Sequence, residues 1–400
     1  MRVRSVFFAC FFILTAPAHA EDSAALDQCH GQNPYFPLLA GGSWTYRTHT
    51  ESLDEGTWDG TAVASFSRRA PEIGAAAVGV MITRFDVPGA TTTSRDEYSL
   101  SEGAVIKRPL GGETTFQSQP GYKVESSPGL PGVLLPPVPA LATGAVWKVK
   151  HRDVTGYAGD SQQFTLSAVT DYAADARRSE TIVTAAGRFR ALKVEGVTDG
   201  SVEEVEPVVG RAQTVETSWY APGVGLVKSE IRAGSFRSSS ELQSFELPSC
   251  CAFVVLESEG ATMSDGGRLQ AGDTLSASSG INVAPGGRVE LGKANGLSVT
   301  LYEGEHGLSL DCPGATAGIF KTIIGKARYW NAKFWSSGSG DVWETNTAWA
   351  GVRGTIFTIE SVRTKRGYKT IVDVEDGEVE LKSRDGARVL RLKAGERGEI

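Results

Sequence analysis

The segment at residues 343–359 constrains the fold of this chain more than any other part of the sequence. It contains two glycines, Gly351 and Gly354, and glycine lets the backbone bend where a side chain would clash. The β-branched and aromatic run from Ile356 to Ile359 follows directly, and such a run is typical of a strand. The segment therefore predicts a tight bend that leads into a strand.

Short strand-like runs separated by turn residues occupy the whole C-terminal part of the chain. After residue 359 they lie at residues 369–374, 378–381 and 389–396. Before residue 343, glycine-containing turn signals recur at roughly the 8–12-residue spacing of short antiparallel strands, and Asn295-Gly296 is the strongest of them. Residues 252–400 are therefore predicted to form an all-β domain of many short strands.

This C-terminal region resembles the FecR-like domain of bacterial envelope proteins. Its first half matches at residues 269–273, 280–283, 289–291 and 297–299, and its second half at residues 392–396 and at Gly351, Val352, Arg353, Gly354 and Thr355. The resemblance implies an extracytoplasmic interaction and signalling module without enzyme activity. FecR-type regulators also carry a membrane helix, for which this sequence has no candidate segment. Control of a sigma factor therefore does not carry over.

The N-terminus predicts export from the cytoplasm. Arg2 and Arg4 precede an apolar run at residues 6–14, and small residues end the segment at Ala18 and Ala20. This order is that of a cleavable signal peptide at residues 1–20, and the apolar run is too short to cross a bilayer as a helix. No later stretch is apolar for long enough to span a membrane either. We expect a periplasmic protein, with release from the cell as the alternative.

Length and charge limit the class of protein further. A chain of 400 residues is expected to form two or three domains. Its 40 basic and 47 acidic residues give a formal net charge of −7, which argues against a general nucleic-acid-binding protein.

The basic residues and tryptophans are concentrated at residues 321–370. This stretch holds nine lysines and arginines, three acidic residues and half of the eight tryptophans. A cationic, aromatic surface suits an envelope protein with an acidic face or an anionic envelope polymer. The residues predicted to bind such a partner are Trp330, Trp335, Trp349, Lys326, Arg328 and Arg353. Two alternatives remain open: the tryptophans could belong to the core, and Arg353 could instead lock the glycine bend.

Four cysteines remain after the predicted cleavage, namely Cys29, Cys250, Cys251 and Cys312. An even number in an oxidising compartment suggests two disulfides. A Cys250–Cys251 bond would close a strained ring between neighbours, and on extended chain the two side chains point to opposite faces. We therefore predict the pairs Cys29–Cys250 and Cys251–Cys312, with free buried thiols as the alternative.

Residues 30–248 are predicted to form a separate N-terminal domain with many strand-like runs. A proline-rich stretch at residues 130–140 is expected to be a covering loop or a sheet edge. The segments at residues 42–44, 186–193 and 219–228 resemble a secreted bacterial domain whose curved antiparallel sheet is similar to the half-barrels of the LolA and LolB lipoprotein carriers. The resemblance implies a concave face that accepts an apolar ligand. A filled, purely structural core is the alternative.

The sequence shows no pattern of catalytic or metal-binding residues. His30, His49, His151 and His306 are scattered, and no zinc motif, nucleophile elbow or complete phosphate-binding loop occurs. We therefore predict a non-enzymatic protein without cofactors that acts in envelope sensing or assembly through its FecR-like domain. The alternative is a periplasmic carrier that holds a lipid or another apolar molecule in its N-terminal domain.

Overall fold

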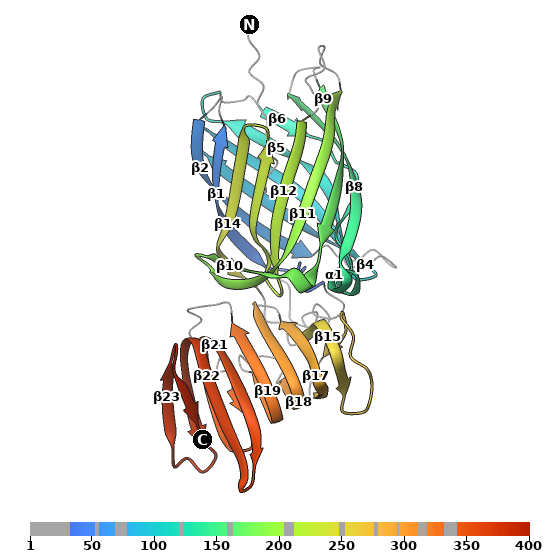
Figure 1. Cartoon of the computed structure of the whole chain (residues 1–400). Coiled ribbons are helices and arrows are strands. Elements are labelled where there is room, and N and C mark those ends of the chain that lie inside the picture. The colour runs from blue at the N-terminus through green and yellow to red at the C-terminus, as the bar shows by residue number, and fades with distance from the viewer. Residues whose placement is uncertain are drawn as a thin grey trace.

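The computed structural model describes residues 33–52, 56–68, 78–119, 123–157, 163–203, 212–247, 253–275, 279–293, 296–310, 318–331 and 342–400. Strands make up almost all of the regular structure in these residues, and the predicted all-β class is confirmed. Figure 1 shows two sheets stacked end to end. The predicted signal peptide, the four cysteines of the predicted disulfides and Trp335 lie outside the described residues.

The N-terminal sheet has 14 strands and closes on itself. The strands are β1 (Ser43–Ser52), β2 (Gly56–Arg68), β3 (Val78–Val87), β4 (Ala90–Ser101), β5 (Ala104–Phe116), β6 (Lys123–Ser126), β7 (Gly132–Leu135), β8 (Ala145–Tyr157), β9 (Gln163–Ala174), β10 (Glu180–Thr184), β11 (Gly187–Glu203), β12 (Ala212–Ala221), β13 (Gly225–Ala233) and β14 (Phe236–Glu246). Their order is β11-β12-β13-β14-β1-β2-β3-β4-β5-β6-β8-β9, with β10 beside β11 and β7 beside β5. Because β9 also pairs with β11, the predicted curved sheet continues past a half-barrel into a ring (Figure 1).

Alternation of side chains gives this closed sheet an inside and an outside. On β1, Trp44, Tyr46, Thr48 and Thr50 are buried, whereas the residues between them are half-buried or exposed. Successive side chains of a strand point to opposite faces, so these four point toward the interior. The sequence of a single strand thus supplies aromatic rings at one end of the interior and hydroxyl groups further along.

Residues 33–39 close the end of the ring that faces the second sheet. The Asn33 side-chain amide donates to the backbone oxygens of Gly103 (3.1 Å) and Pro136 (3.0 Å), and the Gly223 N–H donates to the oxygen of Pro34 (2.7 Å). The proline-rich stretch at residues 130–140 contributes β7, which pairs with β5 alone, and helix α1 (Val138–Thr143). It is therefore an edge with a helical turn, close to the prediction.

Helices are short in the described part of the chain. Besides α1 there is one 3₁₀ turn, η2 (Ala176–Arg178). No helix within the described ranges has the length and apolar character needed to span a bilayer.

The C-terminal sheet has ten strands. They are β15 (Phe253–Met263), β16 (Thr274–Leu275), β17 (Ser279–Lys293), β18 (Leu297–Leu310), β19 (Gly318–Asn331), β20 (Val342–Glu344), β21 (Ala348–Thr364), β22 (Gly367–Ser383), β23 (Val389–Lys393) and β24 (Arg397–Glu399). One core extends from β15 to β23, and at its centre the rings of Phe320 and Trp343 stack with centroids 4.8 Å apart. Trp343 is thus a core residue, the alternative that the sequence left open for the tryptophans.

The predicted tight bend at the glycine motif is an irregularity within β21, so this expectation was wrong. β21 runs through the motif, and its pairing with β22 shifts between Arg353 and Ile356 and again between Ile356 and Phe357. The predicted turn at residues 375–377 also lies inside a strand, with Gly377 at a φ of 84°. An unpaired residue bends a strand pair without ending it, so these strands are longer than the turn signals predict.

Polar contacts join the two sheets. Arg190 of β11 pairs with the buried Glu290 of β17 at 2.8 Å, and Arg188 pairs with Asp376 of β22 at 3.5 Å. The indole N–H of Trp330, on β19, donates to the backbone oxygen of Arg188 at 3.0 Å. Burial raises the pKa of Glu290, and Arg190 opposes this by stabilising the carboxylate. The start of β11 is therefore the main polar connection between the sheets.

Replacing Arg190 with alanine should destabilise the protein by about 2–4 kcal/mol at neutral pH, because Glu290 would stay buried without its cation. The loss should shrink as the pH falls, since protonation of Glu290 removes the unpaired charge. Urea unfolding followed by tryptophan fluorescence measures both effects.

The matched control is Arg391→Ala, which removes an ion pair to Glu380 whose side chains are 73% and 50% exposed. Exposed pairs contribute about 0–1 kcal/mol, so this variant should unfold almost as the wild type does. Equal effects of the two substitutions would show that the connection between the sheets is not stabilising.

Candidate functional site

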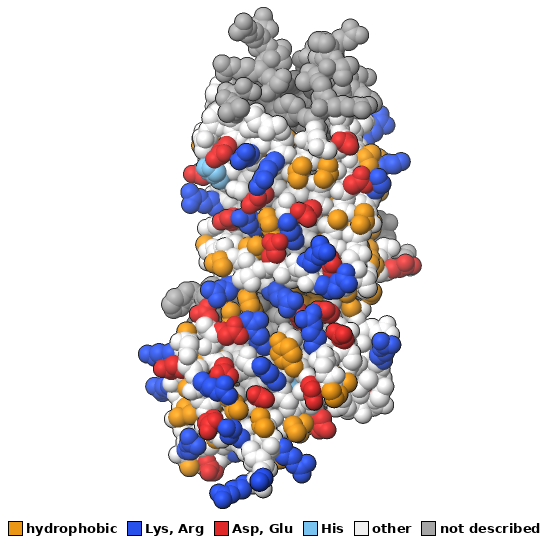
Figure 2. Space-filling model, in the orientation of Figure 1, with side chains coloured by type: hydrophobic (Ala, Val, Ile, Leu, Met, Phe, Trp, Pro, Cys, Tyr) orange, Lys and Arg blue, Asp and Glu red, His pale blue; other side chains and the backbone are white. Residues whose placement is uncertain are grey.

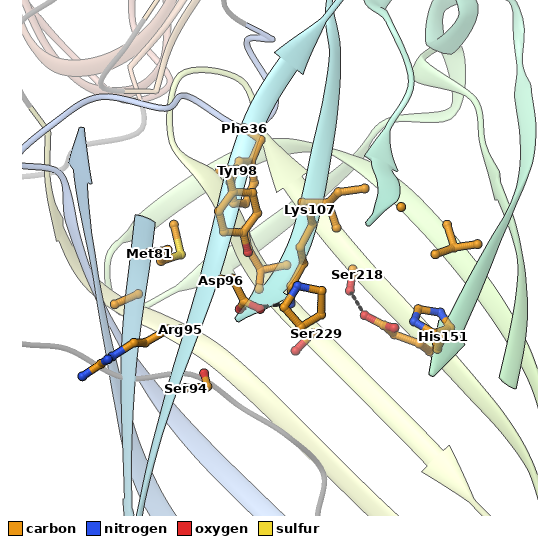
Figure 3. Close-up of a pocket in the computed structure, with 18 of the residues that line it drawn as sticks. Phe36, Met81, Ser94, Arg95, Asp96, Tyr98, Lys107, His151, Ser218 and Ser229 are labelled. Atoms are coloured by element: carbon orange, nitrogen blue, oxygen red, sulfur yellow. Dashed lines mark hydrogen bonds and ion pairs between the residues drawn. The ribbon is translucent and has the colours of Figure 1, made fainter. Parts of the chain in front are cut away.

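A cavity of about 350 Å³ lies inside the N-terminal ring. Its wall is built by inward-facing residues of β1 to β5, β8, β9 and β12 to β14, so side chains distant in sequence meet there. Figure 3 shows part of this lining, including Phe36, Asp96, Lys107, Ser218 and Ser229. The volume is at the lower end of the range of about 300–1,000 Å³ that is usual for small-molecule sites.

Aromatic residues form one end of the cavity. Phe36 stacks on Tyr98 with ring centroids 5.0 Å apart. The Trp44 indole N–H donates to the oxygen of Val224 (2.6 Å), and the Tyr46 hydroxyl donates to the oxygen of Leu226 (3.0 Å). Their polar atoms are thus satisfied by the backbone, and the faces that remain offer apolar surface to a ligand.

An ion pair crosses the wall between β4 and β5. Lys107 lies 3.2 Å from the carboxylate of Asp96, whose side chain is only 6% exposed. A bulge shifts the pairing of the two strands just beyond Asp96, and it depends on Gly111, which has a φ of 100°. A Cβ at Gly111 would come within 2.3 Å of the Ser126 oxygen, so a larger residue would distort this part of the wall.

Glu216 of β12 is the second carboxylate of the lining. It is enclosed by protein but keeps surface toward the cavity, and it accepts a hydrogen bond from the Ser218 hydroxyl at 2.9 Å. Burial raises its pKa, and Lys107 opposes the rise from across the cavity. In the described residues no cation lies within ion-pair distance of Glu216, which distinguishes it from Asp96.

A row of hydroxyl groups runs around the interior beside Glu216. Ser218 of β12 pairs in register with Ser229 of β13, which pairs with Ser240 of β14, which pairs with Thr48 of β1. The hydroxyl oxygens of Ser229, Ser240 and Thr48 are buried and have no hydrogen-bond partner in the described structure. Buried polar groups are nearly always satisfied, and Ser229 and Ser240 line the cavity, so these two are candidates to bind a polar group of a ligand or water.

His151 also lines the cavity, and its Nε2 lies 2.9 Å from the Thr170 hydroxyl. Among the described residues, no three His, Cys, Asp or Glu side chains are grouped closely enough to hold a metal ion. The arrangement is therefore one that binds a molecule through apolar contacts, hydrogen bonds and charge.

The predicted partner-binding residues are separated in the structure. Trp330 is only 9% exposed and contacts the N-terminal sheet, while Arg328 lies over its ring at 5.1 Å and pairs with Glu375. These two side chains are therefore engaged within the chain itself.

The other predicted contacts lie elsewhere. Lys326 is exposed and lies over the ring of Tyr302 at 5.8 Å, and Trp349 is 44% exposed with Arg384 over its ring at 5.3 Å. Arg353 pairs through its backbone with Glu378, and its side chain is not among the described features. Figure 2 shows acidic and basic side chains interspersed over this face of both sheets, so the basic sequence run does not produce a uniformly cationic face here.

Asp96, Lys107 and Glu216 were missed by the reasoning from sequence. One signal was available for Glu216, because it stands in phase with Ser218 and Tyr220 on a strand of alternating residues. A charged residue in the inward phase of a strand is unusual and marks a candidate site.

Comparison with known proteins gives distant likenesses. No family model matches the chain, and no curated protein matches it. A candidate lipoprotein from Parabacteroides distasonis is 14% identical with a TM-score of 0.39, covering 54% of this chain and 99% of its own. A candidate exported protein with a YmcC-like fold from Bacteroides fragilis is 17% identical with a TM-score of 0.35, covering 53% of this chain and 98% of its own.

A candidate anti-sigma factor from Parabacteroides distasonis is a third likeness. It is 18% identical with a TM-score of 0.26, and the match covers 30% of this chain and 54% of that one. Function is therefore inferred from the residues of this chain.

Replacing Glu216 with glutamine should stabilise the protein at neutral pH. Because the pKa of Glu216 is raised by folding, its ionisation opposes folding: stability is highest below about pH 4.3, the unfolded value, and falls as the pH rises through the folded pKa. The amide does not ionise, so the gain should be present at about pH 7 and absent at about pH 3. Thermal unfolding should show it as a rise on the order of 2–4 °C per kcal/mol.

Glu195→Gln is the control for this measurement, since Glu195 is 60% exposed and pairs with Lys193 on the outside of β11. It should show no gain at neutral pH. A Glu216→Gln midpoint below that of the wild type at both pH values would mean that the ionised carboxylate stabilises the fold.

Proposed function

We propose that the N-terminal ring binds a small molecule with an apolar part and that this chain is a carrier or sensor of that molecule. The observation that carries the proposal is the cavity inside the ring, with an aromatic end and a polar wall. Sites of this composition bury most of a ligand in apolar contacts and fix its orientation with a few polar groups. This is the alternative that the LolA- and LolB-like resemblance implied.

The cavity supports ligand binding better than the basic tryptophan region supports partner binding. Two of the predicted partner contacts, Trp330 and Arg328, are engaged in contacts within the chain. The aromatic residues of the cavity, in contrast, have their polar atoms satisfied and still present surface to the empty space.

A FecR-like interaction role for the C-terminal sheet is the second candidate. It is favoured by Trp349, which is 44% exposed with the Arg384 guanidinium over its ring. Exposed tryptophan and arginine are the residues that protein interfaces use most often as anchors. In this proposal the chain is exported by the signal peptide at residues 1–20, takes up its ligand in the periplasm and presents the C-terminal sheet to an envelope protein.

Replacing Ile231 with tryptophan should abolish binding of decanol, a simple molecule with an apolar chain. Ile231 of β13 lines the cavity, and the larger ring would occupy the space that the alkyl chain needs. Titration calorimetry with purified protein measures the affinity, and native mass spectrometry of the wild type tests for a co-purified ligand.

Val215→Trp is the matched control, because Val215 of β12 is 39% exposed and lies in the outward phase next to the inward Glu216. This variant should bind decanol as the wild type does. Absence of decanol binding to the wild type, together with no co-purified molecule, would refute the proposed function.

A further inference from the structure

We infer that the cavity selects ligands whose polar end is a protonated amine, held by Glu216 and the neighbouring row of hydroxyls. This inference rests on the proposed function and adds the chemical class of the ligand. It follows from the charges that face the cavity and from the position of the unpartnered hydroxyls.

Glu216 is a carboxylate of the lining that has no cation at ion-pair distance in the described structure. Asp96 and Lys107 pair at 3.2 Å and largely cancel, whereas Glu216 has only the Ser218 hydroxyl within hydrogen-bond distance in the described structure. Arg95 is exposed and extends away from Asp96 and Lys107 (Figure 3). A ligand cation next to Glu216 would restore neutrality in a region of low dielectric, where charge matters most.

The tyrosines of this region do not supply that cation. Burial raises the pKa of Tyr172 and Tyr220, and the charge of Glu216 raises both further, so both stay neutral phenols. His151 contacts the Thr170 hydroxyl and belongs to β8. An anionic ligand would face Glu216 and Asp96, and the like charges would oppose its binding.

The hydroxyl row matches the hydrogen-bonding capacity of an ammonium group. Such a group has three N–H donors, and its hydrogen bonds to charged or polar oxygens are stronger than those between neutral groups. Ser229 and Ser240 are 2% and 4% exposed and line the cavity, and their hydroxyl oxygens are buried without a partner in the described structure. A χ1 rotation that turns either oxygen toward the cavity would let it accept from the ligand. Ser229 is in register with Ser218, the residue that already holds Glu216, which places carboxylate and hydroxyl acceptors on adjacent strands.

Binding of an amine should depend on pH. Because the pKa of free Glu216 is raised by burial, its carboxyl keeps its proton to higher pH than an ordinary glutamate, and below that pKa the cation must displace the proton. Affinity for an alkylamine should therefore rise with pH through the raised pKa of Glu216 and fall again above about pH 10, where the amine itself loses its charge. Affinity for the corresponding alcohol should stay level over the same range.

Titration calorimetry with decylamine, decanol and decanoate, below their micelle concentrations, tests the inference at neutral pH. The three probes share one alkyl chain and differ in the charge of the polar end. The wild type should bind decylamine about tenfold or more tighter than decanol, and decanoate weakest, since one charge-assisted hydrogen bond contributes about 1.5–3 kcal/mol. Glu216→Gln should abolish the preference for the amine over decanol, whereas Glu195→Gln, on the outer surface, should keep that preference and the affinity for both.

The outcomes separate the two proposals. If decanol and decylamine bind equally to the wild type, or if Glu216→Gln keeps the preference, the amine selectivity is refuted and the ligand-binding function stands. If none of the three probes binds, the proposed function fails and the selectivity fails with it. A thermal unfolding midpoint of Glu216→Gln at or above that of the wild type shows that the variant is folded.

Discussion

The pairing of β9 with β11 is the interaction on which the N-terminal domain depends. Ten residue pairs, from Val194 with Ala174 to Glu203 with Thr165, join the strands and turn a curved sheet into a ring. An open sheet would leave two unpaired edges and expose the inner face to water. Closure satisfies the backbone and separates an interior from an exterior, so that alternating residues meet different environments. The cavity, its aromatic end and its polar wall all follow from this separation.

The interior of the ring has an aromatic part, which packs densely, and a polar part, which lines the cavity. The aromatic end packs densely, and its polar atoms are satisfied by backbone oxygens. The polar wall keeps a carboxylate whose ionisation opposes folding, together with the unpartnered hydroxyls of Ser229 and Ser240. Groups that reduce stability in this way concentrate at functional sites, because any fold could replace them with apolar residues of similar size. This is the physical reason for proposing Glu216 as a binding residue.

The sequence allowed the all-β class to be predicted, because alternation is a local signal, but several glycine-containing turn signals lie inside continuous strands. The predictions from sequence were wrong or incomplete where strand pairing or burial depends on residues that are distant in sequence. The glycine motif around Arg353 was expected to be a turn, but pairing with β22 continues through it as a bulge. The β9–β11 contact that completes the ring has no local signature. Trp330 looked like a surface residue because its partner, the backbone oxygen of Arg188, is 142 positions away.

Strand β11 takes part both in the contact between the two sheets and in the closure of the ring. Its first residues, including Arg188 and Arg190, hold the C-terminal sheet, and its later residues close the ring against β9. Between them, Gly196 stands in register with Glu216 and leaves room for the ring of Tyr172, which a Cβ would meet at 2.6 Å. A single continuous strand thus borders the contact between the sheets and the carboxylate of the cavity. If the proposed ligand displaced β11, it would also move Arg188 and Arg190, the groups that contact the second sheet.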